Sequence, residues 1–125
     1  MSPFAEIMRW VVETTPGAIG GSFAASDGEL VDYWAPGGAD EWAILTATYG
    51  VVLQQLESAF GTWHYGGPEY FIAQHASLDV LVHTVAEGYF ALLAVTTPDH
   101  AAGPPLGIAL SHLQQAISLL REEMS

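Results

Sequence analysis

The chain contains no cysteine and no lysine, and its only strongly basic side chains belong to Arg9 and Arg121. Without thiols it forms no disulfide, supplies no thiolate to a metal ion and has no cysteine nucleophile. Without lysine it cannot contain the phosphate-binding loop that ends in Lys-Ser or Lys-Thr. These absences exclude several common kinds of catalytic site, and we expect no cofactor.

Acidic residues greatly outnumber the two arginines. The chain has 14 Asp and Glu residues, a formal net charge of -12 and a pI near 4.3. Binding to nucleic acid or to an anionic membrane therefore lacks its usual electrostatic attraction, because almost no side chain can neutralise a phosphate. We expect no nucleic-acid or membrane partner, and a basic protein surface is the natural complement.

The length of 125 residues and the 50% content of hydrophobic residues predict a single domain over residues 1–125. The first six residues carry no basic group ahead of an apolar run, so we expect no secretory signal and a cytoplasmic location. Two uncharged stretches do not match a membrane span. Residues 42–56 are too few, and residues 100–120 are interrupted by Pro104-Pro105.

The spacing of apolar residues, together with end signals, predicts three helices. The first covers residues 3–15, and the second runs from a cap at Asp40 to Phe60. Pro104-Pro105 opens the third, which carries Arg121 near its C-terminus, where a cation is favoured.

Five segments have the patterns of strands. The first two, Ala18–Ala25 and Leu30–Trp34, flank an Asp-Gly turn at residues 26–29. Gly20 and Gly21 within the first strand indicate that a helix crosses it closely. The other three segments cover residues 69–76, 79–86 and 89–97, and they are joined by Ser77-Leu78 and Glu87-Gly88. Joints this short predict antiparallel neighbours.

The order helix, two strands, helix, three strands, helix predicts an α+β fold with a five-stranded, mostly antiparallel sheet. The strands are apolar on both sides, so the sheet needs two covers. We expect the central helix on one face and the two terminal helices on the other.

The central helix has two distinct apolar faces. One fits against a sheet and carries large residues: Trp42, Leu45, Tyr49, Val52, Leu56 and Phe60. The other carries small residues and is flanked by Ile44 and Val51: Ala43, Ala47, Gly50 and Gln54. An exposed mid-helix glycine costs up to about 1 kcal/mol relative to alanine. The small face therefore predicts close approach by a second chain, and Gly50→Leu should weaken a dimer while the monomer stays folded.

Several local patterns, taken in order, resemble the roadblock/light-chain family, and within it the bacterial regulators of small GTPases. They are patterns of small, turn and apolar residues that together cover nearly the whole chain. They comprise TPGAIGG at residues 15–21, SDGEL at 26–30, the long helix from Asp40, and EGYFALLAV at 87–95.

The resemblance implies a homodimer, or a dimer with a paralogous roadblock protein, in which central helices lie side by side and edge strands join two sheets. It places the joining edge at Tyr70–Gln74, with Tyr70, Ile72 and Gln74 at the interface. It also implies a platform that scaffolds or regulates a small Ras-like GTPase or its regulators in motility and cell polarity. Such a platform needs no catalytic arginine of its own.

The loop at residues 62–68 is rich in aromatic residues and glycine. Aromatic residues on loops are favoured anchors at protein interfaces, so we predict partner-binding roles for Trp63, His64 and Tyr65, together with Ile44 and Val51 of the central helix. The alternative interpretation is that Trp63 and Tyr65 cover the open end of the sheet.

The histidines are the remaining candidates for chemistry: His64, His75, His83, His100 and His112. Their spacing does not match the His-Glu-x-x-His motif, and His75 and His83 should lie on opposite faces of the sheet, which argues against shared metal ligation. We predict no metal site and no catalytic residue.

The leading hypothesis is a dimeric, non-catalytic interaction module for a Ras-like GTPase. Two alternatives stay open at the level of sequence. One is a small-molecule sensor, because the layout also resembles profilin-like sensor domains, and the other is a small metal-dependent hydrolase.

Overall fold

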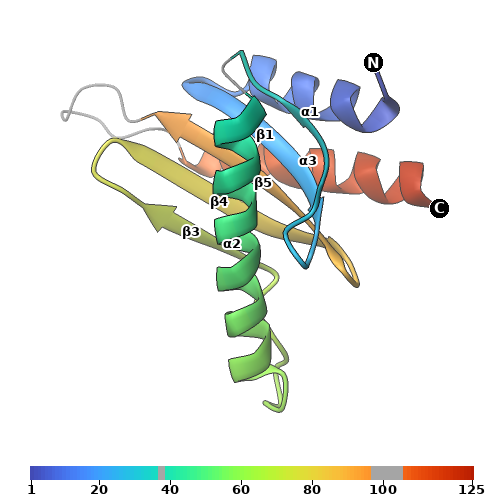
Figure 1. Cartoon of the computed structure of the whole chain (residues 1–125), viewed down its shortest axis with the longest axis vertical. Coiled ribbons are helices and arrows are strands. Elements are labelled where there is room, and N and C mark those ends of the chain that lie inside the picture. Colours follow the sequence, from blue (N-terminus) through green and yellow to red (C-terminus); the bar gives the residue numbers. More distant parts are fainter. Residues whose placement is uncertain (37–38, 97–105) are drawn as a thin grey trace.

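The computed structural model describes residues 1–36, 39–96 and 106–125. The elements follow in the order α1 (Pro3–Thr14), β1 (Ala18–Ala25), β2 (Leu30–Trp34), α2 (Ala39–Phe60), β3 (Tyr70–Gln74), β4 (Leu78–Ala86), β5 (Tyr89–Thr96) and α3 (Leu106–Met124) (Figure 1). The predicted order is confirmed. The loop predicted at 97–103, His100 and Pro104-Pro105 lie outside the described residues.

The strands form one sheet in the order β2-β1-β5-β4-β3, and every neighbouring pair is antiparallel. Helix α2 lies across one face, and α1 and α3 cover the other (Figure 1). The predicted α+β class, the β3-β4-β5 meander and the placement of the three helices are confirmed. The sheet ends at β2 on one side and at β3 on the other.

Each face of the sheet has its own apolar core. The core beneath α1 and α3 includes Met8, Val11, Phe23, Leu81, Leu93, Leu113, Ile117 and Leu120. The core beneath α2 includes Trp42, Tyr49, Leu53, Val80, Val82, Phe90 and Leu92. Within the second core, the buried hydroxyls of Ser22 and Thr46 are hydrogen-bonded at 2.8 Å.

The two strand glycines have the role that the sequence predicts. A Cβ atom on Gly20 would lie 2.1 Å from Cζ2 of Trp42 in α2. A Cβ atom on Gly21 would lie 3.0 Å from Cε of Met8 in α1. Helices therefore approach β1 closely on both faces of the sheet.

The structure corrects the boundaries of two helices. Ser2 caps α1, since its Oγ accepts a hydrogen bond from the Ala5 amide at 3.1 Å, but the helix ends at Thr14. Thr15 is extended and buried, and its hydroxyl bonds Nδ1 of His112 at 3.2 Å. Helix α2 already includes Ala39, so Asp40 lies inside its first turn instead of capping it, where the helix dipole favours an acid.

The hairpin between β3 and β4 is also shifted from its predicted position. The His75 amide donates to the carbonyl of Leu78 at 2.7 Å, and Gln74 pairs with Asp79. The turn is therefore formed by Ala76-Ser77, and Leu78 belongs to β4. None of the helices in the described part of the chain is long and apolar enough to cross a membrane.

Candidate functional site

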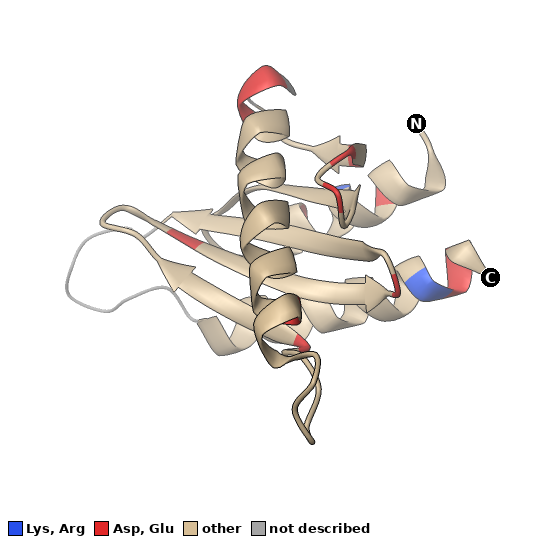
Figure 2. Cartoon of the chain, turned by 60° about the horizontal axis from the view of Figure 1, so that its bottom comes forward, with Lys and Arg blue, Asp and Glu red and all other residues tan. Residues whose placement is uncertain are grey.

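Helix α2 carries no charged residue between Glu41 and Glu57, and Figure 2 shows this long neutral stretch crossing the sheet. The helix meets the sheet through a stripe that differs from the predicted one: Trp42, Thr46, Tyr49, Gly50 and Leu53 are buried. Of the predicted stripe, Leu45, Val52, Leu56 and Phe60 are only half-buried. The helix is therefore rotated so that part of its small face also points inward.

The small face packs on the hairpin between β1 and β2. A Cβ atom on Gly50 would lie 3.1 Å from Cα of Gly28, and one on Gly28 would lie 3.1 Å from Cα of Ala47. The side-chain amide of Gln54 donates to the carbonyl of Ser26. The close neighbour predicted for Gly50 exists, but it belongs to the same chain. Gly50 therefore gives no evidence for a dimer.

The opposite flank of α2 borders an open apolar groove of about 680 Å³ against β3. Helix α2 contributes Glu41, Ile44, Leu45, Thr48, Tyr49 and Val52, and β3 with its following residue contributes Phe71, Ala73 and His75. Ile44 is 68% exposed, which is unusual for an isoleucine within a helix. Apart from Glu41, Thr48 and His75, the side chains that line the groove are apolar or aromatic.

A tyrosine and a histidine that line the groove are hydrogen-bonded to each other. The hydroxyl of Tyr49 is hydrogen-bonded to Nε2 of His75, and the Tyr49 ring lies 6.2 Å from that of Phe71. Burial raises the pKa of Tyr49 above its ordinary value of 10.0, so its hydroxyl stays protonated at neutral pH. The protonated hydroxyl can therefore act as the donor in its hydrogen bond with Nε2 of His75.

Strand β3 is the outermost strand on this side of the sheet, as the resemblance implies for Tyr70–Gln74. Phe71 and Ala73 point to the groove, whereas Ile72 packs into the core on the other face. Tyr70 stacks on His83 at 5.7 Å, also on that other face. An outermost strand presents backbone groups that can pair with another strand.

The aromatic loop, residues 62–68, projects beyond the sheet at the C-terminal end of α2 (Figure 1). Trp63 is 60% and Tyr65 is 89% exposed, and His64 is exposed as well. The interpretation that Trp63 and Tyr65 cover the open end of the sheet is therefore wrong, because α2 carries them away from it.

The histidines have separate surroundings. His75 faces α2, whereas His83 lies on the other face of the sheet, where its Nδ1 contacts the carbonyl of Thr84 at 2.7 Å. Their predicted placement on opposite faces is confirmed. Across the described ranges, no three His, Asp or Glu side chains gather closely enough to hold a metal ion.

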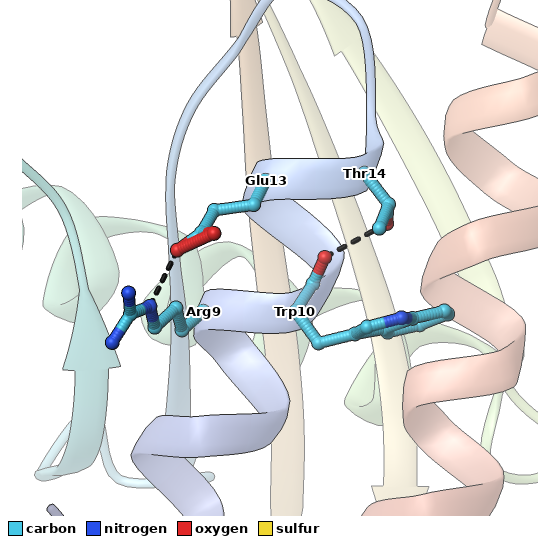
Figure 3. Close-up of polar contacts among 4 residues, drawn as sticks. All are labelled: Arg9, Trp10, Glu13 and Thr14. Carbon is cyan, nitrogen blue, oxygen red and sulfur yellow. Dashed lines mark hydrogen bonds and ion pairs between the residues drawn. The ribbon is translucent and has the colours of Figure 1, made fainter.

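Both arginines have partners within the chain. Arg9 pairs with Glu13 one turn later in α1, as Figure 3 shows, and its guanidinium lies 5.0 Å from the ring centre of Trp34. The same turn is closed by the Thr14 hydroxyl, which donates to the Trp10 carbonyl at 2.7 Å (Figure 3). Nε of Arg121 donates to the carbonyl of Val85. Both arginines therefore belong to helices on the face opposite α2.

No protein-family model matches the sequence, and no curated protein matches it. Solved structures do match the fold. MglB from Myxococcus xanthus is similar with a TM-score of 0.85 and 8% identity, over 99% of this chain and 96% of that one. A roadblock/LC7 domain from Streptomyces avermitilis has a TM-score of 0.77 and 13% identity, over 96% of this chain and 97% of that one.

A third structure, the gliding protein MglB from Thermus thermophilus, has a TM-score of 0.70 and 21% identity, over 96% of this chain and 87% of that one. Profilin IB from Acanthamoeba castellanii is less similar, with a TM-score of 0.60 and 11% identity over 98% and 99%. The chain therefore has the roadblock fold that its sequence patterns predict.

Proposed function

We propose that this roadblock-fold chain forms a dimer that binds a small Ras-like GTPase, or the regulators of one, and scaffolds or regulates it. The observation that carries the proposal is the open apolar groove between α2 and β3, which lies beside the outermost strand of the sheet. The GTPase follows from the resemblance of the sequence to bacterial regulators, and the likeness of the fold to MglB structures supports it.

The proposed dimer uses the groove flank of α2 together with the edge of β3. A two-fold axis beside β3 pairs Tyr70–Gln74 with its copy and brings the second α2 alongside the first. Contact across the groove removes Ile44 and Val52 from water, and the interface residues Tyr70, Ile72 and Gln74 follow from strand pairing. A paralogous roadblock protein can take the place of the second copy.

The proposed GTPase surface is the outward side of α2 together with the aromatic loop. Val51 is 54% exposed, does not line the groove, and lies on one surface with Gln54, Gln55, Ser58 and Ala59 of the same helix. The exposed loop residues Trp63, His64 and Tyr65 follow the C-terminal end of this helix. Neither arginine belongs to this surface. We therefore propose a partner that supplies no arginine finger to the GTPase, so any acceleration of hydrolysis would come from ordering the GTPase's own groups.

The test is binding of the purified protein to the Ras-like GTPase encoded nearest to its gene, in the GDP-bound and GTP-analogue-bound states. Binding without faster hydrolysis supports a scaffold, and binding with faster hydrolysis supports an activator. Absence of binding in both states contradicts the proposal. A small molecule retained through purification, found by native mass spectrometry, would instead support the profilin-like sensor.

A further inference from the structure

We infer that the aromatic loop binds an arginine- or lysine-bearing segment of a protein partner. The inference rests on the proposed function, since it specifies the chemistry of the partner surface that meets the loop. It starts from two rings, those of Trp63 and Tyr65, which are 60% and 89% exposed. Large aromatic side chains are normally buried in proteins, and exposed ones on a projecting loop are typical of binding anchors.

The loop holds its rings in a defined outward arrangement. The Trp63 amide donates to the Phe60 carbonyl at 3.0 Å, and the Gly66 amide donates to the Trp63 carbonyl at 3.1 Å. Gly66 has a φ of +74°, which favours glycine, so the second turn is well matched to its residue. The Trp63 ring contacts Phe60 edge to face at 5.2 Å. Two turns and one ring contact thus order the anchor before binding.

The charges around the loop select a cationic partner. The sequence has no lysine or arginine between Arg9 and Arg121, and the loop is bracketed by Glu57 and Glu69. Both glutamates line a cleft of about 470 Å³ next to the loop, together with Glu87. Arg121 also lines this cleft, where its Nε donates to the carbonyl of Val85. Its positive charge offsets one of the three carboxylates, so the cleft keeps an excess of negative charge.

A positively charged side chain can interact with both the exposed aromatic rings and the flanking carboxylates. A guanidinium or ammonium group over an indole or phenol ring gains a cation–π contact, and Trp is the strongest acceptor. The same charge is attracted to the flanking carboxylates. Single-stranded nucleic acid also stacks on aromatic rings, but its phosphates would be repelled by a chain with a net charge of -12.

The experiment uses the full chain, labelled with ¹⁵N, and a short arginine-rich peptide as the probe. The matched control peptide has citrulline, which is uncharged and nearly the same shape, in place of every arginine. We expect the arginine peptide to shift the NMR signals of the Trp63 indole and of residues 57–66 most strongly. The citrulline peptide should leave them nearly unchanged.

The variant Trp63→Ala/Tyr65→Ala should bind the arginine peptide about fivefold or more weakly, as expected for the loss of two exposed cation–π contacts. The control Glu122→Gln/Glu123→Gln removes two negative charges at the exposed end of α3. It should weaken binding of the arginine peptide by less than the loop variant does. Unchanged dispersion of the NMR spectrum shows that each variant is folded.

Three outcomes of the peptide experiment contradict the inference, and a fourth comes from the GTPase assay. The citrulline peptide binds equally well, the loop variant binds as tightly as the natural chain, or the signal changes spread evenly over all acidic surfaces. These results are independent of the GTPase assay. Peptide binding at the loop without GTPase binding would reject the proposed function alone, and GTPase binding that survives the loop variant would reject the inference alone.

Discussion

Gly50 of α2 and Gly28 of the turn between β1 and β2 lie in direct backbone contact, since a Cβ atom on Gly50 would be 3.1 Å from Cα of Gly28. Gly28 has a φ of +90°, so the turn needs glycine for its conformation as well as for the contact. This pair sets how closely α2 can lie on the hairpin, and with it the flank of α2 that stays open toward β3.

Gly50→Leu should destabilise the fold itself. A leucine there must displace the turn or the ring of Phe90, and overpacking of this kind costs about 1–3 kcal/mol. The measurement is the free energy of unfolding in urea. The control is Gly107→Ala in α3, where nothing lies within 4 Å of the added methyl group and stability should hold or rise. An unchanged unfolding free energy for Gly50→Leu, with weaker association, would restore the interpretation drawn from the sequence.

Gly20→Ala should be more damaging than its single methyl group suggests. The new Cβ atom would lie 2.1 Å from the Trp42 ring, so the helix or the ring must move, and we expect a loss of about 2 kcal/mol or more. In the Trp42→Leu background the same substitution should cost clearly less, because the obstructing ring is gone. Equal costs in the two backgrounds would show that the ring is not the obstacle.

The hydroxyls of Ser22 and Thr46 should be energetically coupled. Ser22→Ala leaves the Thr46 hydroxyl buried without this partner and should cost about 1–3 kcal/mol. Adding Thr46→Val removes the stranded hydroxyl, so the double variant should be more stable than the sum of the single changes predicts. A double-mutant cycle in urea measures the coupling, and strict additivity would argue against it.

The buried hydroxyl of Tyr49 should make folding weaker at alkaline pH. Its pKa is raised in the folded chain by burial, so between 10.0 and that higher value the unfolded chain loses a proton that the folded chain keeps. The Tyr49 hydroxyl therefore makes its full contribution to the free energy of unfolding below pH 10.0. That contribution is lost as the pH rises through the pKa of Tyr49 in the folded chain. The difference in unfolding free energy between the natural chain and Tyr49→Phe, followed on both sides of pH 10.0, should shrink on the alkaline side. A constant difference contradicts the assignment.

The sequence predicts the elements and the layers because these depend on local periodicity and short joints. The outermost strand is what the resemblance to the roadblock/light-chain family implies. It does not predict which flank of α2 is open, because that depends on how the helix is rotated over the sheet. Gly50 signals a close neighbour correctly, but its spacing in the sequence cannot tell an intrachain hairpin from a second molecule. The groove is lined by residues separated along the chain, such as Ile44 and Phe71, and only their packing reveals it.

The exposure of the aromatic loop is a further property that local patterns leave open. Trp63 and Tyr65 suit both an anchor and a cover for the sheet, and the outcome depends on how far α2 extends past the strands (Figure 1). Helix α2 follows β1, since Trp42 lies against Gly20 and Gln54 bonds Ser26. A helix of 22 residues is about 33 Å long, whereas a strand of eight residues such as β1 spans about 26 Å. The length of α2 is thus the sequence feature that favours exposure of the aromatic loop.

Sedimentation velocity on two α2 variants decides whether a second copy occupies the groove between α2 and β3, on which the proposed dimer depends. Ile44 lines the groove and Val51 does not, although both are exposed apolar residues of the same helix. We predict that the natural chain and Val51→Arg sediment as dimers at micromolar concentration, whereas Ile44→Arg sediments as a folded monomer. A natural chain that is monomeric, or an Ile44→Arg variant that remains dimeric, would rule out this use of the groove.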